Sequence, residues 1–300
     1  MSYRELFISN PLTFLGSELS YEEADYVVIG VPLDVTSTFR GGSRFAPTRL
    51  REASLNLETY SFRTALDVED LKVADLGDLH TVADVRETLD RVSSVSREFL
   101  EESKLPVFLG GEHTLTLGVV EGIKKPVGVV SFDAHLDLRD EYSGLKTSHA
   151  TFMRRISELI GAENIFEIGT RAVCREEIAF AKKEKINFVT SQEVIREGVM
   201  EISKRLQRFL AEHDNIYLSI DMDVLDPAFA PAVQNPEPEG LSYPQLIDLI
   251  EVLCKEKLIG FDLVEISPEY DNGATVIQGV KIIFETLAYI ERSRTRNKHA

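Results

Sequence analysis

Short apolar segments alternate with longer segments of helical periodicity along most of the chain. The apolar segments are rich in β-branched residues and mostly continuous, as in strands that are buried on both faces. They predict eight strands, at 26–31, 72–77, 106–111, 127–134, 165–170, 187–190, 216–223 and 259–266. The segments between them predict helices at 84–103, 175–185, 199–213, 243–256 and 275–293.

Two helical segments begin with residues typical of helix starts. Ser191 precedes QEVIREG, and Ser242 is followed by Pro244 near the first turn. A serine at this position can cap free backbone N–H groups, and the fixed φ of proline suits the first turn.

Strand–helix alternation over the whole length predicts an α/β fold with a mostly parallel sheet and helices on both faces. No shift in composition, linker or internal repeat divides the sequence, so we expect a single domain over residues 1–300. A length of 300 residues with 43% hydrophobic content is enough for one large core.

The chain is acidic, with a formal net charge of −17. Such a chain repels nucleic acids and anionic membranes; its surface either favours a cationic partner or is an ordinary soluble surface. The two cysteines, Cys174 and Cys254, have no paired spacing and suggest free thiols in a reducing compartment. Because no signal peptide and no membrane-spanning run of about 18 apolar residues is evident, we expect a cytoplasmic protein.

Polar side chains follow four of the predicted strands. In a parallel α/β sheet, ligands bind outside the carboxyl ends of the strands. The sequences PVFLGGEH, VGVVSFDAHLD, IYLSIDMD and IGFDLVEI therefore bring residues of metal-binding type to one edge. The candidate metal ligands are His113, Asp133, His135, Asp137, Asp221 and Asp223.

The alternating triplet Asp133, His135 and Asp137 is the strongest of these signals. On a strand its side chains would share one face, which is costly unless a partner satisfies them; a solvated loop is the alternative. Taken together, the three segments that carry the candidate ligands, PVFLGGEH, VGVVSFDAHLD and IYLSIDMD, favour cation binding. Oxygen donors with a minority of imidazoles indicate a manganese-type ion. Six side chains exceed the needs of one ion and suit two divalent cations about 3.5–4 Å apart that share a hydroxide.

The segments GGEH, SFDAHLD and SIDMDVLDP resemble the signature segments of the arginase/agmatinase (ureohydrolase) family. GVPLDVTSTFRGGSRFAPTRLR (30–51) and VEISPEYDNGATV (264–276) resemble the N-terminal and C-terminal segments of that family. The resemblance extends over about residues 25 to 290. It implies an arginase-like, three-layer α/β/α fold and a hydrolase of guanidino groups with two Mn²⁺ ions. It also implies a homo-oligomer, either a trimer or a hexamer.

The resemblance also assigns metal ligands. The residues that match ligands of the first Mn²⁺ are His113, Asp133, Asp137 and Asp221. His135 and Asp223 match the second ion, with Asp133 and Asp221 as the bridges.

Three residues are expected to act in catalysis, and two of them match catalytic positions of the family. His149 in TSHAT matches a proton-transfer histidine, and Glu265 matches the acid that pairs with the substrate guanidinium. Asp137 is expected to accept a proton from a metal-bridging hydroxide that attacks the guanidinium carbon. The alternatives are an exposed loop histidine for His149 and a salt-bridged acid for Glu265.

The nature of the substrate's tail depends on residues after the triplet. Arg139 stands where arginase-type members have an asparagine, and EISPEYD resembles the agmatinases. Asp140 and Glu141 place negative charge near the expected tail pocket, which suits a cationic tail. Arg139 either pairs with Asp140, Glu141 or Glu112 or binds a substrate carboxylate. We therefore expect hydrolysis of agmatine, or of a derivative such as aminopropylagmatine, to urea and a polyamine such as putrescine.

Other substrates and a non-enzymatic role remain as alternatives. Two departures from the family bear on the substrate: Ala150 follows His149 where a glycine is common, and VQNPEPEG replaces a Gly-Thr-type turn. The rival activities are those of an arginase, a guanidino-acid amidinohydrolase and a formimidoylglutamase. A catalytically silent binding homologue is the alternative from another class, although all six ligand positions are retained.

Overall fold

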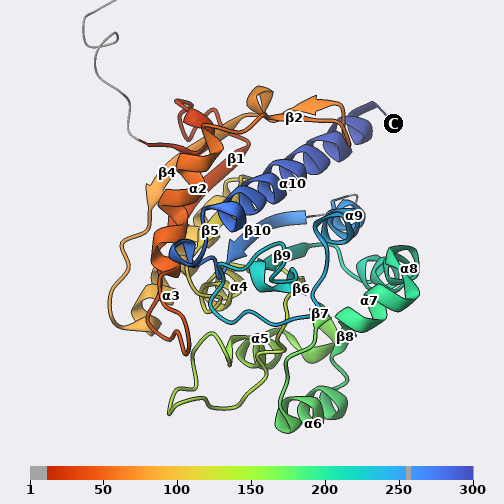
Figure 1. The fold of residues 1–300 in the computed structure, drawn as a ribbon. Helices are drawn as coiled ribbons and strands as arrows, with labels where there is room; N and C mark the ends of the chain where they lie inside the picture. Colours follow the sequence, from red (N-terminus) through yellow and green to blue (C-terminus); the bar gives the residue numbers. More distant parts are fainter. Residues whose placement is uncertain (1–11, 255–257, 300) are drawn as a thin grey trace, which may run out of the picture.

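The computed structural model describes residues 12–254 and 258–299, and a sheet of eight strands forms its centre (Figure 1). In chain order the strands of this sheet are β1 (Tyr26–Val31), β4 (Val73–Asp78), β5 (Leu105–Gly110), β6 (Gly128–Phe132), β7 (Ile165–Thr170), β8 (Asn187–Thr190), β9 (Ile216–Asp221) and β10 (Leu258–Val264). Their spatial order is β4-β1-β5-β10-β9-β6-β7-β8, and each ladder between them is parallel. A small hairpin of β2 (Tyr60–Ser61) and β3 (Leu66–Asp67) lies outside this sheet.

Helices cover both faces of the sheet, because successive strand residues point to opposite sides. Tyr26 and Val28 of β1 pack into one apolar layer, and Val27 and Ile29 pack into the other. The first layer includes residues of α2 (Ala46–Ser54), α7 (Ser191–Glu197), α8 (Val199–Ala211), α9 (Tyr243–Leu253) and α10 (Ala274–His299). The second includes residues of α3 (Val85–Glu101), α4 (Leu115–Gly122), α5 (Phe152–Ile160) and α6 (Arg175–Glu184). The expected three-layer α/β/α fold with an eight-stranded sheet is confirmed.

The helix starts agree with the sequence analysis at one position and differ by one residue at the other. The backbone N–H and the hydroxyl of Ser242 both donate to Gln245 at the start of α9. At the start of α7 the cap is Thr190, which exchanges hydrogen bonds with Glu193. Ser191 is the first helical residue rather than the cap.

Three helices, α2, α4 and α5, were not predicted from the sequence. The last two residues of the helix expected at 243–256 lie outside the described residues, as do residues 1–11, where no signal peptide is expected. Cys174 and Cys254 are free thiols. Across the described ranges, no helix combines the length and apolar character needed to cross a membrane.

β5, β6, β9 and β10 end earlier than predicted, and the ends of β6 and β9 change how the candidate ligands are presented. β6 ends at Phe132, and β9 ends at Asp221. The expectation that Asp133, His135 and Asp137 share one face of a strand is therefore wrong. Asp133 accepts a hydrogen bond from the N–H of His135 at 2.6 Å, and Asp137 has a φ of 49°. This local side-chain-to-backbone bond competes with the ladder and turns the chain out of the sheet.

Candidate metal centre and substrate cavity

The four strands that precede the candidate residues are neighbours in the middle of the sheet. Their order is β5-β10-β9-β6, although they are far apart in the sequence. His113 follows β5, and the triplet of Asp133, His135 and Asp137 follows β6. Asp221 is the last residue of β9, and Asp223 comes two residues later. Glu265 follows β10. Because the strands are parallel, all these residues lie at the same edge.

His113 is at the centre of a first group of ligand-type atoms. Its Nδ1 lies 3.0 Å from Asp133 Oδ2 and 3.0 Å from Asp221 Oδ2. Asp137 Oδ2 is farther away, at 4.0 Å. His113 is buried, and its Nδ1 has no hydrogen-bond partner. A buried nitrogen that faces three carboxylates without a donor between them fits a bound cation.

A second group of ligand-type atoms shares Asp133 with the first. His135 Nδ1 lies 3.0 Å from Asp223 Oδ2 and 3.4 Å from Asp133 Oδ1. In each of the two groups, His113 with Asp133 and Asp221, and Asp133 with His135 and Asp223, one atom per residue lies within 4.8 Å of the others. The structure therefore brings together all six residues expected as ligands and makes Asp133 common to both groups.

Backbone N–H groups orient these carboxylates. Asp221 Oδ1 accepts from the N–H of Asp223 at 2.8 Å, and Asp223 Oδ1 accepts from Ala134 at 3.0 Å. The other oxygen of each carboxylate faces an imidazole. Fixed oxygen donors with two imidazoles suit hard divalent cations, and the residues present fit a pair of them.

Without a cation, the buried carboxylates of the cluster repel one another. Burial raises the pKa of Asp137 and Asp221, and neighbouring carboxylates raise it further. Burial alone would lower the pKa of His113, but the carboxylate of Asp133, which lies 3.0 Å from its Nδ1, raises it to about 9. Protons thus stand in for positive charge at this edge, and a cation that binds here has to displace them.

A buried hydrogen-bonded chain holds the other side of the His113 ring. His113 Nε2 lies 2.8 Å from Ser219 Oγ, and that hydroxyl donates to Asp262 at 2.6 Å. Asp262 also accepts from Tyr217 at 2.8 Å and from Thr116 at 2.9 Å. With Ser219 as donor to Asp262, His113 Nε2–H donates to Ser219, which leaves Nδ1 free to bind a cation. No sequence motif marks this chain of hydrogen bonds, because Asp262 and Ser219 lie inside strands.

A cavity of about 440 Å³ opens onto the cluster. Among the predicted residues, its wall includes His135, Asp137, Arg139, His149, Asp221, Asp223 and Glu265. It also includes residues that the sequence analysis did not single out as site residues, among them Thr38, Arg171, Glu177 and Glu237. Thr38 and Glu237 lie in the quoted segments 30–51 and VQNPEPEG, but nothing there distinguished them from their neighbours. Arg171, after β7, and Glu177, on α6, lie outside every quoted motif.

Glu265 and His149 lie side by side at the cavity. Glu265 Oε1 accepts a hydrogen bond from the N–H of His113 at 2.6 Å, and Oε2 is buried without a partner. His149 Nδ1 is 4.0 Å from Glu265 Oε1, and His149 Nε2 is 3.1 Å from the hydroxyl of Thr38. Burial, together with positive charge on His135 and His113, lowers the pKa of His149 to about 4. His149 is a buried residue, not the exposed loop histidine of the alternative interpretation.

The two residues expected at the substrate tail occupy different positions. Arg139 lines the cavity, stacks over Tyr142 and lies 3.8 Å from Glu177. The expected partners Asp140, Glu141 and Glu112 are therefore replaced by Glu177 on α6. The carboxylate of Asp140 points to Arg155, at 2.9 Å, and is not among the residues of the cavity wall.

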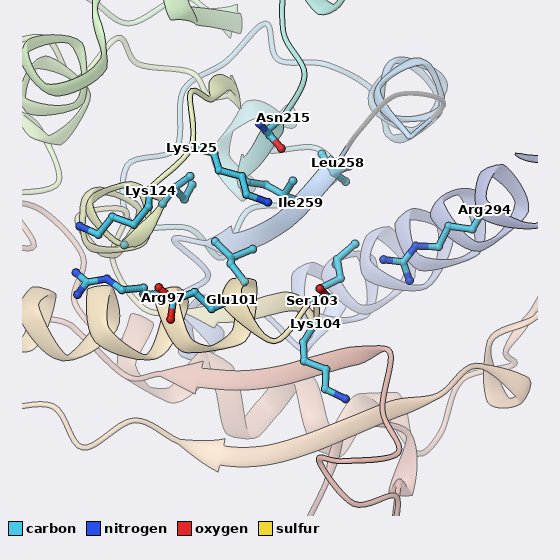
Figure 2. A pocket seen from close by; sticks show the side chains of 14 residues that line it. Arg97, Glu101, Ser103, Lys104, Lys124, Lys125, Asn215, Leu258, Ile259 and Arg294 are labelled. Carbon is cyan, nitrogen blue, oxygen red and sulfur yellow. The ribbon is translucent and has the colours of Figure 1, made fainter.

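A second cavity, of about 490 Å³, lies at the opposite edge of the sheet (Figure 2). Leu105 and Leu258, at the starts of β5 and β10, are part of its wall, as are Lys124 and Lys125. Helices α3 and α4 end beside it, and cations near helix C-termini complement the helix dipole. In the described part of the chain, none of the expected site residues lines this cavity.

Comparison with known proteins agrees with this geometry. Residues 24–288 match the model of the arginase family. An N(1)-aminopropylagmatine ureohydrolase from Thermococcus kodakarensis is 40% identical over 274 residues, which cover 89% of this chain and 91% of the relative. An agmatinase from Pyrococcus horikoshii is 35% identical over 274 residues, with 90% and 94% coverage.

A solved structure extends the similarity to the whole fold. The agmatine ureohydrolase of Thermoplasma volcanium superimposes with a TM-score of 0.92 at 38% sequence identity. The match covers 98% of this chain and 99% of that chain. The arginase-like character of the fold is confirmed.

Proposed function

The chain belongs to the arginase family, and from this premise we propose that it hydrolyses the guanidino group of agmatine or of an agmatine derivative to urea and an amine. Glu265 supports this proposal most directly. Its Oε2 is buried without a partner beside the clustered carboxylates and imidazoles. A guanidinium stays charged at all ordinary pH values, and its N–H groups fit a carboxylate. A substrate guanidinium would satisfy this oxygen.

We assign two divalent cations to the cluster, with manganese as the preferred metal. His113, Asp133, Asp137 and Asp221 would hold one ion and His135 with Asp223 the other, bridged by Asp133 and Asp221. When bound, the cations supply a nucleophile near neutral pH by lowering the pKa of water.

The chain's own residues orient the substrate and move protons. Glu265 holds the guanidinium against the cluster. Burial raises the pKa of Asp137, so its carboxylate can accept a proton when the nucleophile attacks the guanidinium carbon. His149 has a pKa of about 4 and is therefore neutral at pH 7, so that its imidazole can take up a proton and pass it to the leaving amine.

The charges around Arg139 favour a cationic tail over an anionic one. Arg139 faces Glu177, so part of its positive charge is already offset within the protein. The relatives named for agmatine or aminopropylagmatine support the same choice. A guanidino acid is the second candidate, because the Arg139 side chain lines the cavity and could bind a carboxylate. The role of Asp140 in binding the substrate tail stays a prediction. Its carboxylate pairs with Arg155 and does not line the cavity.

Several wider expectations remain proposals. We propose one domain over residues 1–300, a homo-oligomer and a cytoplasmic location. The acidic balance of the chain, with 50 acidic and 33 basic residues, supports a small cationic substrate rather than a nucleic acid or a membrane surface.

A panel of substrates tests the proposed function. Purified protein with Mn²⁺ is incubated with agmatine, aminopropylagmatine, arginine and 4-guanidinobutyrate, and urea is measured before and after chelation. We expect metal-dependent urea release, with the highest kcat/KM for a guanidino amine. Turnover of arginine alone would contradict the substrate choice. Absence of urea from all four, with metal bound, would contradict the proposed function and leave a formimidoylglutamase, which releases formamide, or a catalytically silent homologue.

A further inference from the structure

The cavity wall contains six carboxylates, and five of them already have a role. Three belong to the cation cluster, Glu265 adjoins it, Glu177 lies under Arg139, and the sixth is Glu237. Glu177 accepts from the N–H of Leu138 at 3.2 Å and of Cys174 at 2.8 Å. Both carboxylate oxygens of Glu177 thus already accept hydrogen bonds within the protein.

Glu237 differs from Glu177, because its carboxylate accepts no hydrogen bond and forms no ion pair among the residues that the structure describes. Burial lowers the pKa of Arg171, and the negative charge of Glu237 acts against this shift. All three guanidinium nitrogens of Arg171 donate to backbone carbonyls, including those of Asp223, Glu237 and Pro238. Arg171 therefore fixes the loop by its backbone and leaves the Glu237 carboxylate available to a ligand.

The loop that carries Glu237 is held in one position. Glu237 stands between Pro236 and Pro238, so its own backbone is restricted to extended conformations. Arg171 donates to the carbonyls of Glu237 at 2.8 Å and Pro238 at 2.9 Å. Little conformational entropy is lost when such a residue binds a ligand.

The same loop is joined to Glu265. The N–H of Gln234 donates to the carbonyl of Glu265 at 3.2 Å. Glu237 is three positions after Gln234, which limits the distance between their Cα atoms to about 11 Å. A spacer of four carbons is shorter than this limit, and the side chains of Glu237 and Glu265, which both line the cavity, cover the remaining distance.

We propose that Glu237 receives the terminal ammonium of the substrate and so makes the site specific for guanidino alkylamines. This inference deepens the proposed function and rests on it. Glu265 would bind the guanidinium end and Glu237 the amine end, with the charge of Glu237 offering a charge-assisted hydrogen bond. The same carboxylate would repel the tail of a guanidino acid.

The test compares two substrates that differ only at the tail. Agmatine and n-butylguanidine share a four-carbon chain, but n-butylguanidine lacks the ammonium. Urea release is measured with Mn²⁺ for the wild type, Glu237→Gln and the control Glu239→Gln. Glu239 is exposed, and its carboxylate accepts from Gln192 rather than facing the cavity.

We expect Glu237→Gln to lower kcat/KM for agmatine by about tenfold to a hundredfold more than for n-butylguanidine, the loss of one hydrogen bond to a charged group. Glu239→Gln should retain the wild-type ratio between the two substrates. An equal loss for both substrates, or no loss for agmatine, overturns the role of Glu237 while leaving the proposed hydrolase intact. If wild-type protein with bound Mn²⁺ releases urea from no guanidine, the proposed function falls and the inference falls with it.

Discussion

Two residues of the site, Glu265 and Asp137, have backbone conformations that are unfavourable for residues with a side chain. Their φ values are 67° and 49°. Each such conformation costs about 1–3 kcal/mol and persists only where surrounding contacts enforce it. The Glu265 N–H donates to the carbonyl of Gly111 at 2.9 Å, and the carbonyl of Asp137 accepts from Arg154 at 3.2 Å. These bonds direct both carboxylates toward the cluster.

Replacement of Glu265 by Gln tests the guanidinium contact. The amide oxygen can still accept the N–H of His113, so the fold should persist, but the charge opposite the guanidinium is lost. We expect kcat/KM for agmatine to fall about tenfold to a hundredfold, as for a lost charged hydrogen bond of about 1.5–3 kcal/mol. Steady-state urea assays and a thermal unfolding curve measure this. Wild-type kinetics in the variant would remove Glu265 from the substrate site.

Asp223→Asn tests the second cation position. Asn can keep the hydrogen bond from the N–H of Ala134, but it offers a neutral amide to the ion in place of a carboxylate. We expect retained folding, a sharp loss of activity and fewer than two Mn²⁺ per chain by elemental analysis. Asp248→Asn, at a surface pair with Arg63, is the matched control. Two bound ions and normal activity in Asp223→Asn would show that the ligand assignment is wrong there.

Two strands and one helix cooperate behind the site. Asp262 on β10 accepts from Tyr217 and Ser219 on β9 and from Thr116 on α4, and Ser219 contacts the ring of His113. A histidine ligand is oriented by the hydrogen bond of its second nitrogen. The strands thus set the direction of an imidazole that lies beyond their ends.

Asp262→Asn tests this role as a positioning residue. We expect the Kd for Mn²⁺ to rise by about tenfold to a hundredfold, because the His113 tautomer is no longer fixed. Calorimetric titration with Mn²⁺ measures the Kd, and Tm is recorded in parallel. Tyr217→Phe removes one bond to the same carboxylate but leaves Ser219 in place, so its Tm should fall with little change in Kd. Equal Kd values in both variants and the wild type would reduce Asp262 to a purely structural role.

For the molecule as a whole, the binding of cations is coupled to protons. In the metal-free protein the pKa of His113 rises from 6.5 to about 9. A raised pKa stabilises the folded protein fully below pH 6.5, and this contribution is lost as the pH rises through about 9. A cation at Nδ1 requires the neutral ring, so it replaces the proton rather than adding to it.

The affinity for Mn²⁺ should therefore increase with pH. Between about pH 6.5 and 9, each proton released on binding lowers the Kd about tenfold per pH unit. Anaerobic calorimetry at several pH values, in buffers of different ionisation enthalpy, counts the protons. Over the same range the chelated protein should lose stability while the Mn²⁺-loaded protein does not. A Kd that is independent of pH would contradict the protonated state of His113.

Elements with a clear period could be predicted from the sequence, and others could not. β1, β7 and β8 have the predicted bounds, because continuous β-branched runs are typical of strands buried on both faces. α4 was missed, since nearly all its residues are buried and it shows no polar face from which a helical period could be read. The ends of β6 and β9 were misjudged because carboxylate-to-backbone bonds, rather than hydrophobicity, end those strands.

The sequence by itself determined the succession of the eight strands of the sheet, the family and the residue types at the cation cluster, because local pattern and short motifs carry that information. Only the tertiary structure decided which separate loops share one cavity. Arg139 meets Glu177, Asp140 turns to Arg155, and Glu237 joins the wall through Arg171. Such pairings depend on strand order and loop path, and neither spacing nor composition encodes the distance between residues so far apart in the chain.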